Sequence, residues 1–241
     1  LFDGIMSAVY VLLIVAASEK LYRKIFPNHL SFENIINPSN FNSKLFFNNY
    51  FIGFVFSLCI LAFSGIFYTV LDNSGYYIAF PRLDFNNMLT YNPLLYILSF
   101  AIEDSFWNII IYTFSFLLSY HLTKSKIFSI FIASFFFSFN VGFDTDPVYL
   151  NNIYLFIIGL SSGFILLRFG VLSLWVSSFS YIILSNIFLY FYTSQLYFIT
   201  TGIILILLLL SPLIYNLLYY IKYQHVPGSK SLLNSAISTP E

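Results

Sequence analysis

Residues 93–123 read PLLYILSFAIEDSFWNIIIYTFSFLLSYHLT, and the interpretation of the whole chain starts from this stretch. It is apolar enough to cross a bilayer, yet it carries two adjacent carboxylates, Glu103 and Asp104, with Asn108 one helical turn after Asp104. A charged side chain at membrane depth costs about 2.5–3.5 kcal/mol on insertion scales, so it usually faces a protein interior or a water-filled cavity. The stretch therefore predicts a membrane helix that contributes to a polar site.

The composition excludes a water-soluble globule. Of the 241 residues, 59% are hydrophobic and 8% are charged, whereas soluble domains carry about 25% charged residues. Ten Lys and Arg balance ten Asp and Glu, and no basic cluster that would bind nucleic acid is present in the sequence. The single cysteine, Cys59, cannot form an internal disulfide. The lipid bilayer is therefore the expected surrounding, and neither nucleic acid nor a soluble small-molecule substrate is expected as a partner.

The apolar runs predict an all-α fold, a polytopic transmembrane helical bundle of about seven spans. About 20 apolar residues are needed to cross a hydrocarbon core of roughly 30 Å. The expected spans cover residues 2–18, 50–71, 93–123, 126–143, 148–169, 170–192 and 196–221, the last of them kinked at Pro212. Residues 1–221 thus form a single transmembrane domain, and residues 222–241 form a polar tail.

Two connectors are candidates for partner contact because of their length and aromatic content. Residues 19–49 form a polar connector, in which an amphipathic surface helix is expected near residues 21–26. Residues 72–92 open with the turn sequence Asp-Asn-Ser-Gly, and their aromatic side chains predict a place in the membrane interface.

The positions of the cationic residues predict the orientation. With seven spans, the first, third and fifth connectors and the tail share one side of the membrane. Nine of the ten Lys and Arg residues fall there: Lys20, Arg23, Lys24, Lys44, Lys124, Lys126, Arg168, Lys222 and Lys230. Only Arg82 falls on the opposite side. By the positive-inside rule, the N-terminus is external and the tail is cytoplasmic, and we expect an integral protein of the cell membrane.

This orientation places several polar side chains at similar depth. Glu103 and Asp104 lie in the outer half of the third span, Asn140 lies near the outer end of the fourth, and Asn186 lies in the outer third of the sixth. A polar pocket open to the external side is therefore expected. Two alternatives remain. The asparagines can form hydrogen bonds between helices without a chemical role. The acids can lie at a water-exposed kink or, with one of them protonated, lock two helices together.

The remaining motifs carry no catalytic or metal signature. His29, His121 and His225 lack the spacing to a second ligand that a zinc site requires. The sequence GLSSG, residues 159–163, is a small-xxx-small pattern that lets two helices approach closely. No phosphate-binding loop or nucleophile elbow is present in the sequence. Neither a cofactor nor a metal is expected.

Four short sequences occur in an order that resembles the CPBP family of intramembrane proteases, which includes CAAX prenyl endopeptidases and bacteriocin-processing enzymes. AIEDSFWN (101–108) is similar to the family's EExxxR motif, and FFSFN (136–140) to its FxxxH motif. FIIGLSSGFILLRFGVLSLW (156–175) resembles its Gly-rich helix-turn-helix, and SYIILSN (180–186) its final HxxxN or HxxxB motif. The resemblance covers about residues 94–192 and implies a CPBP-like core in spans three to six.

In that family, a glutamate activates a water molecule, while histidines and an asparagine assist or stabilise the oxyanion. The family's basic residues are replaced here by uncharged side chains: Asn108, Asn140, and Tyr181 or Ile182. The resemblance thus implies a degenerate catalytic set consisting of Glu103, Asp104, Asn140 and Asn186.

The function expected first is non-catalytic: a scaffold, or an accessory subunit of a membrane complex with other membrane protein subunits as partners. One alternative is an active intramembrane peptidase that uses Glu103 as the water-activating base. Another is a transport or proton-relay component in which Glu103 and Asp104 are the protonatable sites.

Overall fold

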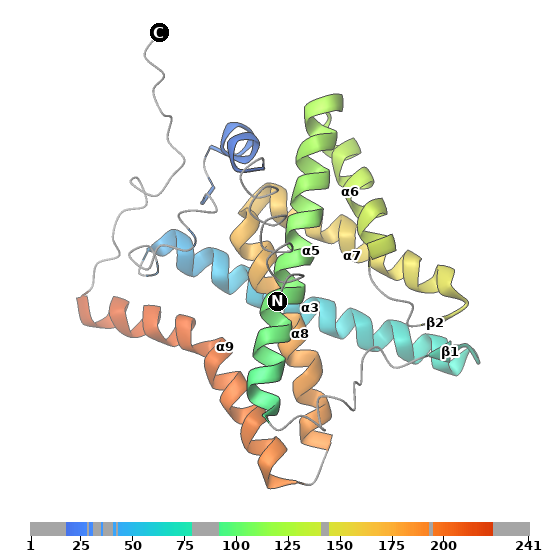
Figure 1. Cartoon of the computed structure of the whole chain (residues 1–241). Helices are drawn as coiled ribbons and strands as arrows, with labels where there is room; N and C mark the ends of the chain where they lie inside the picture. Colours follow the sequence, from blue (N-terminus) through green and yellow to red (C-terminus); the bar gives the residue numbers. More distant parts are fainter. Residues whose placement is uncertain are drawn as a thin grey trace, which may run out of the picture.

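Six long helices make up most of the computed structural model, which describes residues 18–27, 29–30, 35, 41, 43–78, 92–140, 145–192 and 195–223 (Figure 1). They are α3 (Lys44–Asn73), α5 (Pro93–Thr123), α6 (Lys126–Asn140), α7 (Val148–Phe169), α8 (Val171–Tyr192) and α9 (Leu196–Tyr223). Residues 18–25 form a further short helix. Two strands of two residues each, β1 (Tyr77–Ile78) and β2 (Thr145–Asp146), pair antiparallel and join the loops that flank α3 and α7. The all-α prediction is confirmed.

Five of the described helices are long and apolar enough to cross a membrane. The candidate spans are Lys44–Asn73, Pro93–Thr123, Val148–Phe169, Val171–Phe188 and Leu196–Tyr219. The first expected span, residues 2–18, lies outside the described residues except for Ser18. The fourth is shorter than expected, because the 15 residues of α6 rise about 22 Å against a hydrocarbon core of roughly 30 Å. The helices thus support a multi-pass membrane protein with five candidate spans among the described residues.

Local chemistry explains where the helices begin and end. Asn92 caps α5 by accepting a hydrogen bond from the Leu95 N–H, and Pro93 occupies the first turn, where its missing N–H has no cost. Lys124 ends α5 in the left-handed conformation, with φ at 58°. The side chain of Ser43 caps α3 by accepting from the Phe46 N–H, so α3 begins before the expected residue 50.

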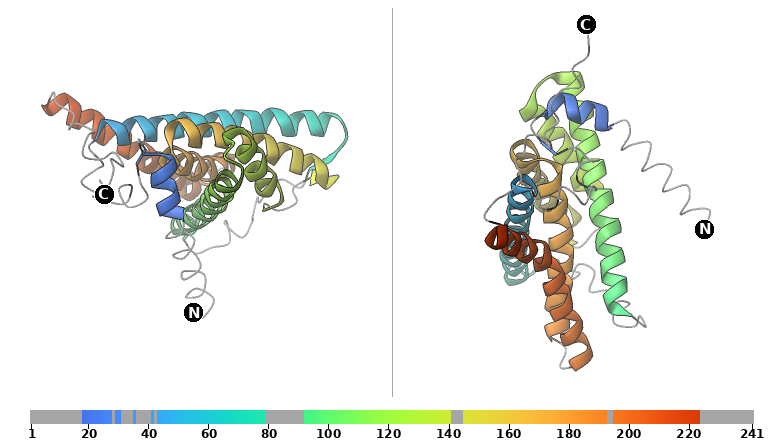
Figure 2. Two further views of the ribbon diagram at one scale, coloured as in Figure 1. Left: turned by 90° about the horizontal axis from the view of Figure 1, so that it is seen from above. Right: turned by 90° about the vertical axis from the view of Figure 1, so that its left-hand side faces the viewer.

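The helices form two groups that cross, and both groups contribute side chains to the main hydrophobic core. Figure 1 shows α3 and α7 running across the direction of α5 and α8, and the right-hand view of Figure 2 shows α3 nearly end-on while α5 and α8 run along the page. One group joins α5, α8 and α9 through Ile97, Ile183 and Leu205. The other joins α3 and α7 through Ile60 and Tyr154. The helices therefore cross rather than form a simple parallel bundle.

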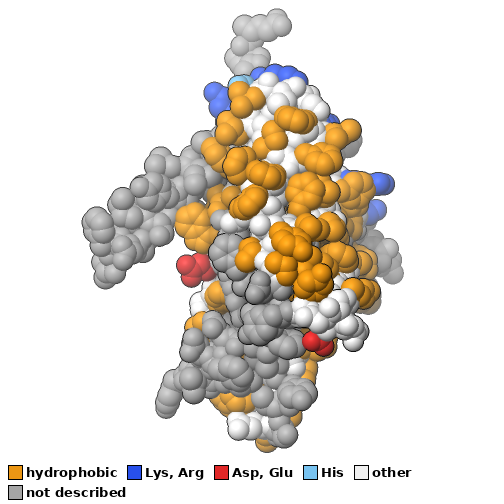
Figure 3. All heavy atoms as spheres, turned by 90° about the vertical axis from the view of Figure 1, so that its right-hand side faces the viewer, with side chains coloured by type: hydrophobic (Ala, Val, Ile, Leu, Met, Phe, Trp, Pro, Cys, Tyr) orange, Lys and Arg blue, Asp and Glu red, His pale blue; other side chains and the backbone are white. Residues whose placement is uncertain are grey.

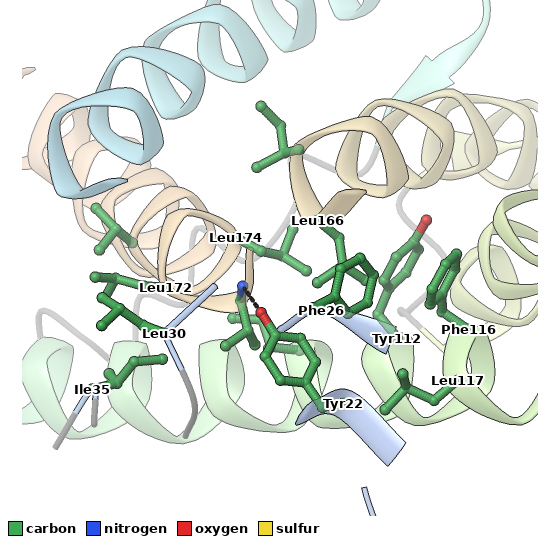
Figure 4. Close-up of a cluster of buried hydrophobic side chains, with 14 of the residues drawn as sticks. Tyr22, Phe26, Leu30, Ile35, Tyr112, Phe116, Leu117, Leu166, Leu172 and Leu174 are labelled. Atoms are coloured by element: carbon green, nitrogen blue, oxygen red, sulfur yellow. Dashed lines mark hydrogen bonds between the residues drawn. The ribbon is translucent and has the colours of Figure 1, made fainter. Parts of the chain in front are cut away.

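The main hydrophobic core contains a part of the chain that the sequence places on the surface. The docked segment, which we define as residues 18–27 and 29–30, begins with the short helix. Its Tyr22 is 0% exposed and Phe26 is 5% exposed, and both belong to the main core (Figure 4). Phe26 lies against Phe116 of α5 with ring centroids 6.0 Å apart. The helix expected near residues 21–26 therefore exists. Its aromatic face is buried between α5 and the α7–α8 turn, while Lys20 and Lys24 are exposed.

The kink expected at Pro212 has a clear chemical basis. Pro212 lies inside α9, and its missing N–H leaves the Leu208 carbonyl without its usual helical donor. The Ser211 hydroxyl donates to that carbonyl at 2.8 Å, while the Tyr50 hydroxyl of α3 donates to the neighbouring Leu209 carbonyl at 2.8 Å. Figure 1 shows α9 bending along its length, so the bend is supported by hydrogen bonds within α9 and from α3.

Candidate functional site

The inward face of α5 makes a polar contact with α8. Ala101 and Ser105, one turn apart, are both 0% exposed. The indole N–H of Trp175 on α8 donates to the Ser105 hydroxyl oxygen at 3.1 Å, and the Ser105 hydroxyl donates to the Ile102 carbonyl at 3.2 Å. The side of α5 that carries Ala101 and Ser105 therefore faces α8.

The acidic pair lies away from that inward face. Glu103 is two residues from both Ala101 and Ser105, a rotation of about 200° around the helix. Its side chain is exposed, and Asp104 is half-buried. Among the described residues, no salt bridge reaches Glu103. Glu103 thus lies on the outer surface of this chain and is not sheltered between its described helices, in contrast to the expectation from its membrane depth.

Asp104 and Asn108 share a face of α5, as their spacing predicts. The Asn108 side-chain amide donates to an Asp104 carboxylate oxygen at 3.1 Å. Asn108 stands where the CPBP resemblance expects an arginine, and an amide supplies a hydrogen bond without a positive charge. The pair can therefore hold the Asp104 carboxylate in position.

Of the two other predicted site residues, Asn186 has a described side chain and Asn140 does not. Asn186 is half-buried on α8, and its side-chain amide donates to the Ile182 carbonyl of the same helix at 2.8 Å. Asn140 is the last residue of α6, and its side chain lies outside the described part of the structure. The pocket expected from Glu103, Asp104, Asn140 and Asn186 therefore stays a prediction.

A cluster of three hydroxyls forms where α3, α7 and α8 meet, and the sequence analysis did not identify it. The Ser64 hydroxyl makes a short hydrogen bond with Tyr154 and lies 3.3 Å from the Tyr181 hydroxyl. The two tyrosine hydroxyls are 3.5 Å apart. Tyr181 stands at one of the two positions where the CPBP resemblance expects a histidine. Its hydroxyl joins a network between helices that contains no strong base, so the network can hold helices together but cannot activate water at neutral pH.

A second buried tyrosine connects α5, α6 and α7. The Tyr112 hydroxyl donates to the Gly159 carbonyl at 2.7 Å and lies 3.5 Å from the Ser134 hydroxyl. A Cβ added at Gly159 would be 2.9 Å from the Ser134 Cα, and one at Gly163 would be 2.6 Å from the Tyr112 hydroxyl. The small-xxx-small pattern therefore has the packing role that its sequence predicts.

The turn between α7 and α8 is closed by the docked segment. The Val171 N–H donates to the Tyr22 hydroxyl oxygen at 3.1 Å (Figure 4), which satisfies one of the free N–H groups at the start of α8. Gly170 has φ at 87°, and a Cβ there would be 3.0 Å from His29 Nδ1. Burial raises the pKa of the Tyr22 hydroxyl, so it stays protonated. Burial, together with the nearby charge of Lys126, lowers the pKa of His29.

The described residues offer no metal centre. No group of three or more His, Cys, Asp or Glu side chains that could hold a metal ion occurs among them. His121 is exposed near the end of α5.

Comparison with known proteins adds no assignment. No family model, no curated protein and no solved structure matches this chain.

Proposed function

We propose that this multi-pass membrane protein is a non-catalytic scaffold or an accessory subunit of a membrane complex, and that it is a degenerate relative of the CPBP intramembrane proteases. The observation that carries the proposal is the outward position of Glu103 on a long apolar helix, next to the half-buried Asp104. We propose further that it belongs to the cell membrane, with an external N-terminus and a cytoplasmic tail.

The free-energy cost of exposing a carboxylate to lipid supports the presence of a partner subunit next to Glu103. Insertion scales assign about 2.5–3.5 kcal/mol to one charged side chain at the centre of a membrane helix, and such residues normally face protein or water. Glu103 faces away from α8, and its side chain is exposed. A neighbouring subunit with a cationic or amide side chain at this level of α5 would remove the cost.

The polar groups inside the bundle favour a structural role over hydrolysis. A hydrolase needs a base and oxyanion donors within hydrogen-bonding reach of one reacting carbonyl. Instead, the Asn186 amide donates within its own helix, Trp175 donates to Ser105, and Tyr181 joins other hydroxyls. The contacts of Trp175 and Tyr181 link helices, which is what a scaffold requires.

The test is co-purification from native membranes in a mild detergent. We expect partner proteins to travel with the chain in fixed ratio, and the double variant Glu103→Gln with Asp104→Asn to lose them at least tenfold. The matched control is Asp72→Asn, which removes an exposed acid at the end of α3 and is expected to retain the partners. Equal retention by the double variant, or a wild-type chain that purifies alone, contradicts the proposal.

A peptide-cleavage assay is the second part of the same test. The purified chain is incubated with membrane-embedded and prenylated peptides, and cleavage is followed by mass spectrometry. The scaffold proposal expects no cleavage above that of a mock purification. Cleavage that disappears in the variant Glu103→Ala would replace the proposal by the peptidase alternative, with Glu103 as the water-activating base.

A further inference from the structure

The outer face of α6 has an apolar groove near the cationic turn between α5 and α6. Four α6 side chains and one from α7 line an open groove of about 410 Å³ in which no polar atom is exposed: Phe131, Ile132, Phe135, Phe136 and Phe156. Figure 3 shows apolar side chains covering this side of the molecule, with Lys and Arg side chains at its upper end, where Figure 1 has the turn between α5 and α6.

Two lysines mark that turn. Lys124 ends α5 in the left-handed conformation, Lys126 begins α6, and both side chains are exposed. Between them, the Ser125 hydroxyl accepts from the Phe128 N–H at 3.4 Å and so caps α6. The turn therefore holds two cations at the end of α6 where the apolar groove begins.

The fold brings further cations to the same end of the molecule. Lys126 lies close enough to His29 for its charge to act on that ring, and a Cβ at Gly170 would lie 3.0 Å from His29. The docked segment, the α5–α6 turn and the α7–α8 turn thus meet at one end, with Lys20, Lys24 and Arg168 exposed there. Glu19, the acid described in the docked segment, is paired with Arg23 at 2.6 Å. This end is therefore positively charged, which complements an anionic headgroup.

The distance along α6 from Lys126 to the far end of the groove matches the thickness of one leaflet. Lys126 and Phe136 are ten residues apart, about 15 Å along the helix, which is half of a hydrocarbon core of roughly 30 Å. A lipid whose headgroup lies at the lysines would therefore place an acyl chain along the phenylalanines to the bilayer midplane. Cations at one end and only carbon along the rest are the chemistry of an anionic amphiphile.

We propose that the turn between α5 and α6 binds one anionic phospholipid, with its phosphate at Lys124 and Lys126 and one acyl chain in the groove of Phe131, Phe135 and Phe156. This site is independent of the partner surface at Glu103, since it needs only the chain itself and the bilayer.

The test counts lipids on the purified full-length chain. The protein is reconstituted in nanodiscs of phosphatidylcholine with a minor fraction of phosphatidylglycerol, released into detergent, and examined by native mass spectrometry. We expect one phosphatidylglycerol per chain to be retained. A lysine near an anionic surface typically contributes about fivefold in affinity, so Lys124→Gln with Lys126→Gln is expected to reduce retention roughly 25-fold.

Matched variants distinguish binding at this site from the general electrostatic attraction between anionic lipids and the cations of the protein. Phe131→Ala with Phe135→Ala is expected to lower retention while both lysines remain. Two controls are expected to retain the lipid: Lys44→Gln removes an exposed cation at the start of α3, outside the α5–α6 turn, and Phe164→Ala with Phe188→Ala removes exposed rings of α7 and α8. Circular dichroism melts confirm that each variant is folded.

Four results would overturn the assignment: equal retention of phosphatidylcholine, no retained lipid, an equal loss in the Lys44 variant, or displacement of the lipid by soluble glycerol phosphate. The last result would mean that phosphate binds without the acyl chain, and so that the groove has no part in binding.

Discussion

Trp175 of α8 and Ser105 of α5 are joined by a hydrogen bond of 3.1 Å from the indole N–H to the hydroxyl oxygen. This contact connects two residues 70 positions apart in the sequence and lies on the buried face of α5. Because Ser105 and Ala101 face inward, Glu103 faces outward. The face of α5 that makes this neutral hydrogen bond is thus opposite the face that exposes the Glu103 carboxylate.

The first prediction tests that contact. Ser105→Ala and Trp175→Phe are each expected to lower the free energy of unfolding, and the coupling between them in a double-mutant cycle is expected to be about 0.6 kcal/mol, the average for hydrogen bonds between membrane helices. The measurement is unfolding in mixed micelles followed by circular dichroism. Strictly additive effects of the two substitutions would show that the bond contributes nothing to stability.

The second prediction concerns close helix packing. Gly159→Ala is expected to destabilise the protein by about 1–3 kcal/mol, the usual cost of overpacking, because the new Cβ would be 2.9 Å from the Cα of Ser134, a backbone atom that cannot rotate away. The matched control is Gly65→Ala in α3, where nothing lies within 4 Å of the added carbon. The control is expected to be neutral or slightly stabilising, since Ala favours helix over Gly. A similar loss in both variants would mean that α6 and α7 are not in close contact.

The third prediction addresses the hydroxyl cluster between α3, α7 and α8. Tyr154→Phe keeps the ring, which packs 4.8 Å from Phe67, but removes the hydrogen bond to Ser64. We expect a loss of about 0.5–1.5 kcal/mol, measured by the same unfolding assay. Tyr149→Phe, at an exposed position of α7, is the control and is expected to have no effect. An unchanged midpoint for Tyr154→Phe would remove the cluster from the interactions that hold α3 against α7.

The fourth prediction is a pH dependence that arises from His29. Its pKa in the folded protein is lowered by burial and by Lys126, whereas the unfolded chain has the ordinary value of about 6.5. Below about pH 6.5, the unfolded chain therefore binds a proton more readily than the folded protein does, and the free energy of unfolding falls as the pH decreases. Above about pH 6.5, this contribution is fully present.

The measurement is the unfolding midpoint between pH 8 and pH 5. We expect the wild type to lose stability on acidification, and His29→Gln to lose much of that slope. His121→Gln, an exposed histidine near the end of α5, serves as the control and should keep the wild-type slope. A slope that survives in His29→Gln would assign the acid sensitivity to another group.

Several features of the fold could be predicted because they depend only on local sequence. The bounds of α5 were predicted as residues 93–123 and are observed as Pro93–Thr123, because Asn92 and Pro93 start the helix and the apolar run carries it on. The bounds of α7 follow in the same way from Pro147 and Gly170. The start of α3 was placed at residue 50 and lies at Lys44, because the polar Asn48 and Asn49 concealed a helix that Ser43 begins.

The candidate site could be predicted only in part. The shared face of Asp104 and Asn108 follows from their spacing and is confirmed by their hydrogen bond. The contact of Ser64 with Tyr154 could not be predicted, because the two residues are 90 positions apart and depend on how α3 crosses α7. The burial of Tyr22 was missed for a similar reason, since a short amphipathic helix has the same pattern whether its apolar face meets lipid or protein.

The sequence by itself determined that this chain is built from long apolar helices for a membrane, where α5 and α7 begin and end, and which small and polar residues share a helical face. These properties depend on hydrophobicity, capping and periodicity over a few residues. Only the tertiary structure decided that Glu103 faces outward, that Tyr22 closes the turn before α8, and that three hydroxyls from distant helices meet. Those outcomes depend on which helix packs against which, and that is set by contacts between residues far apart in the chain.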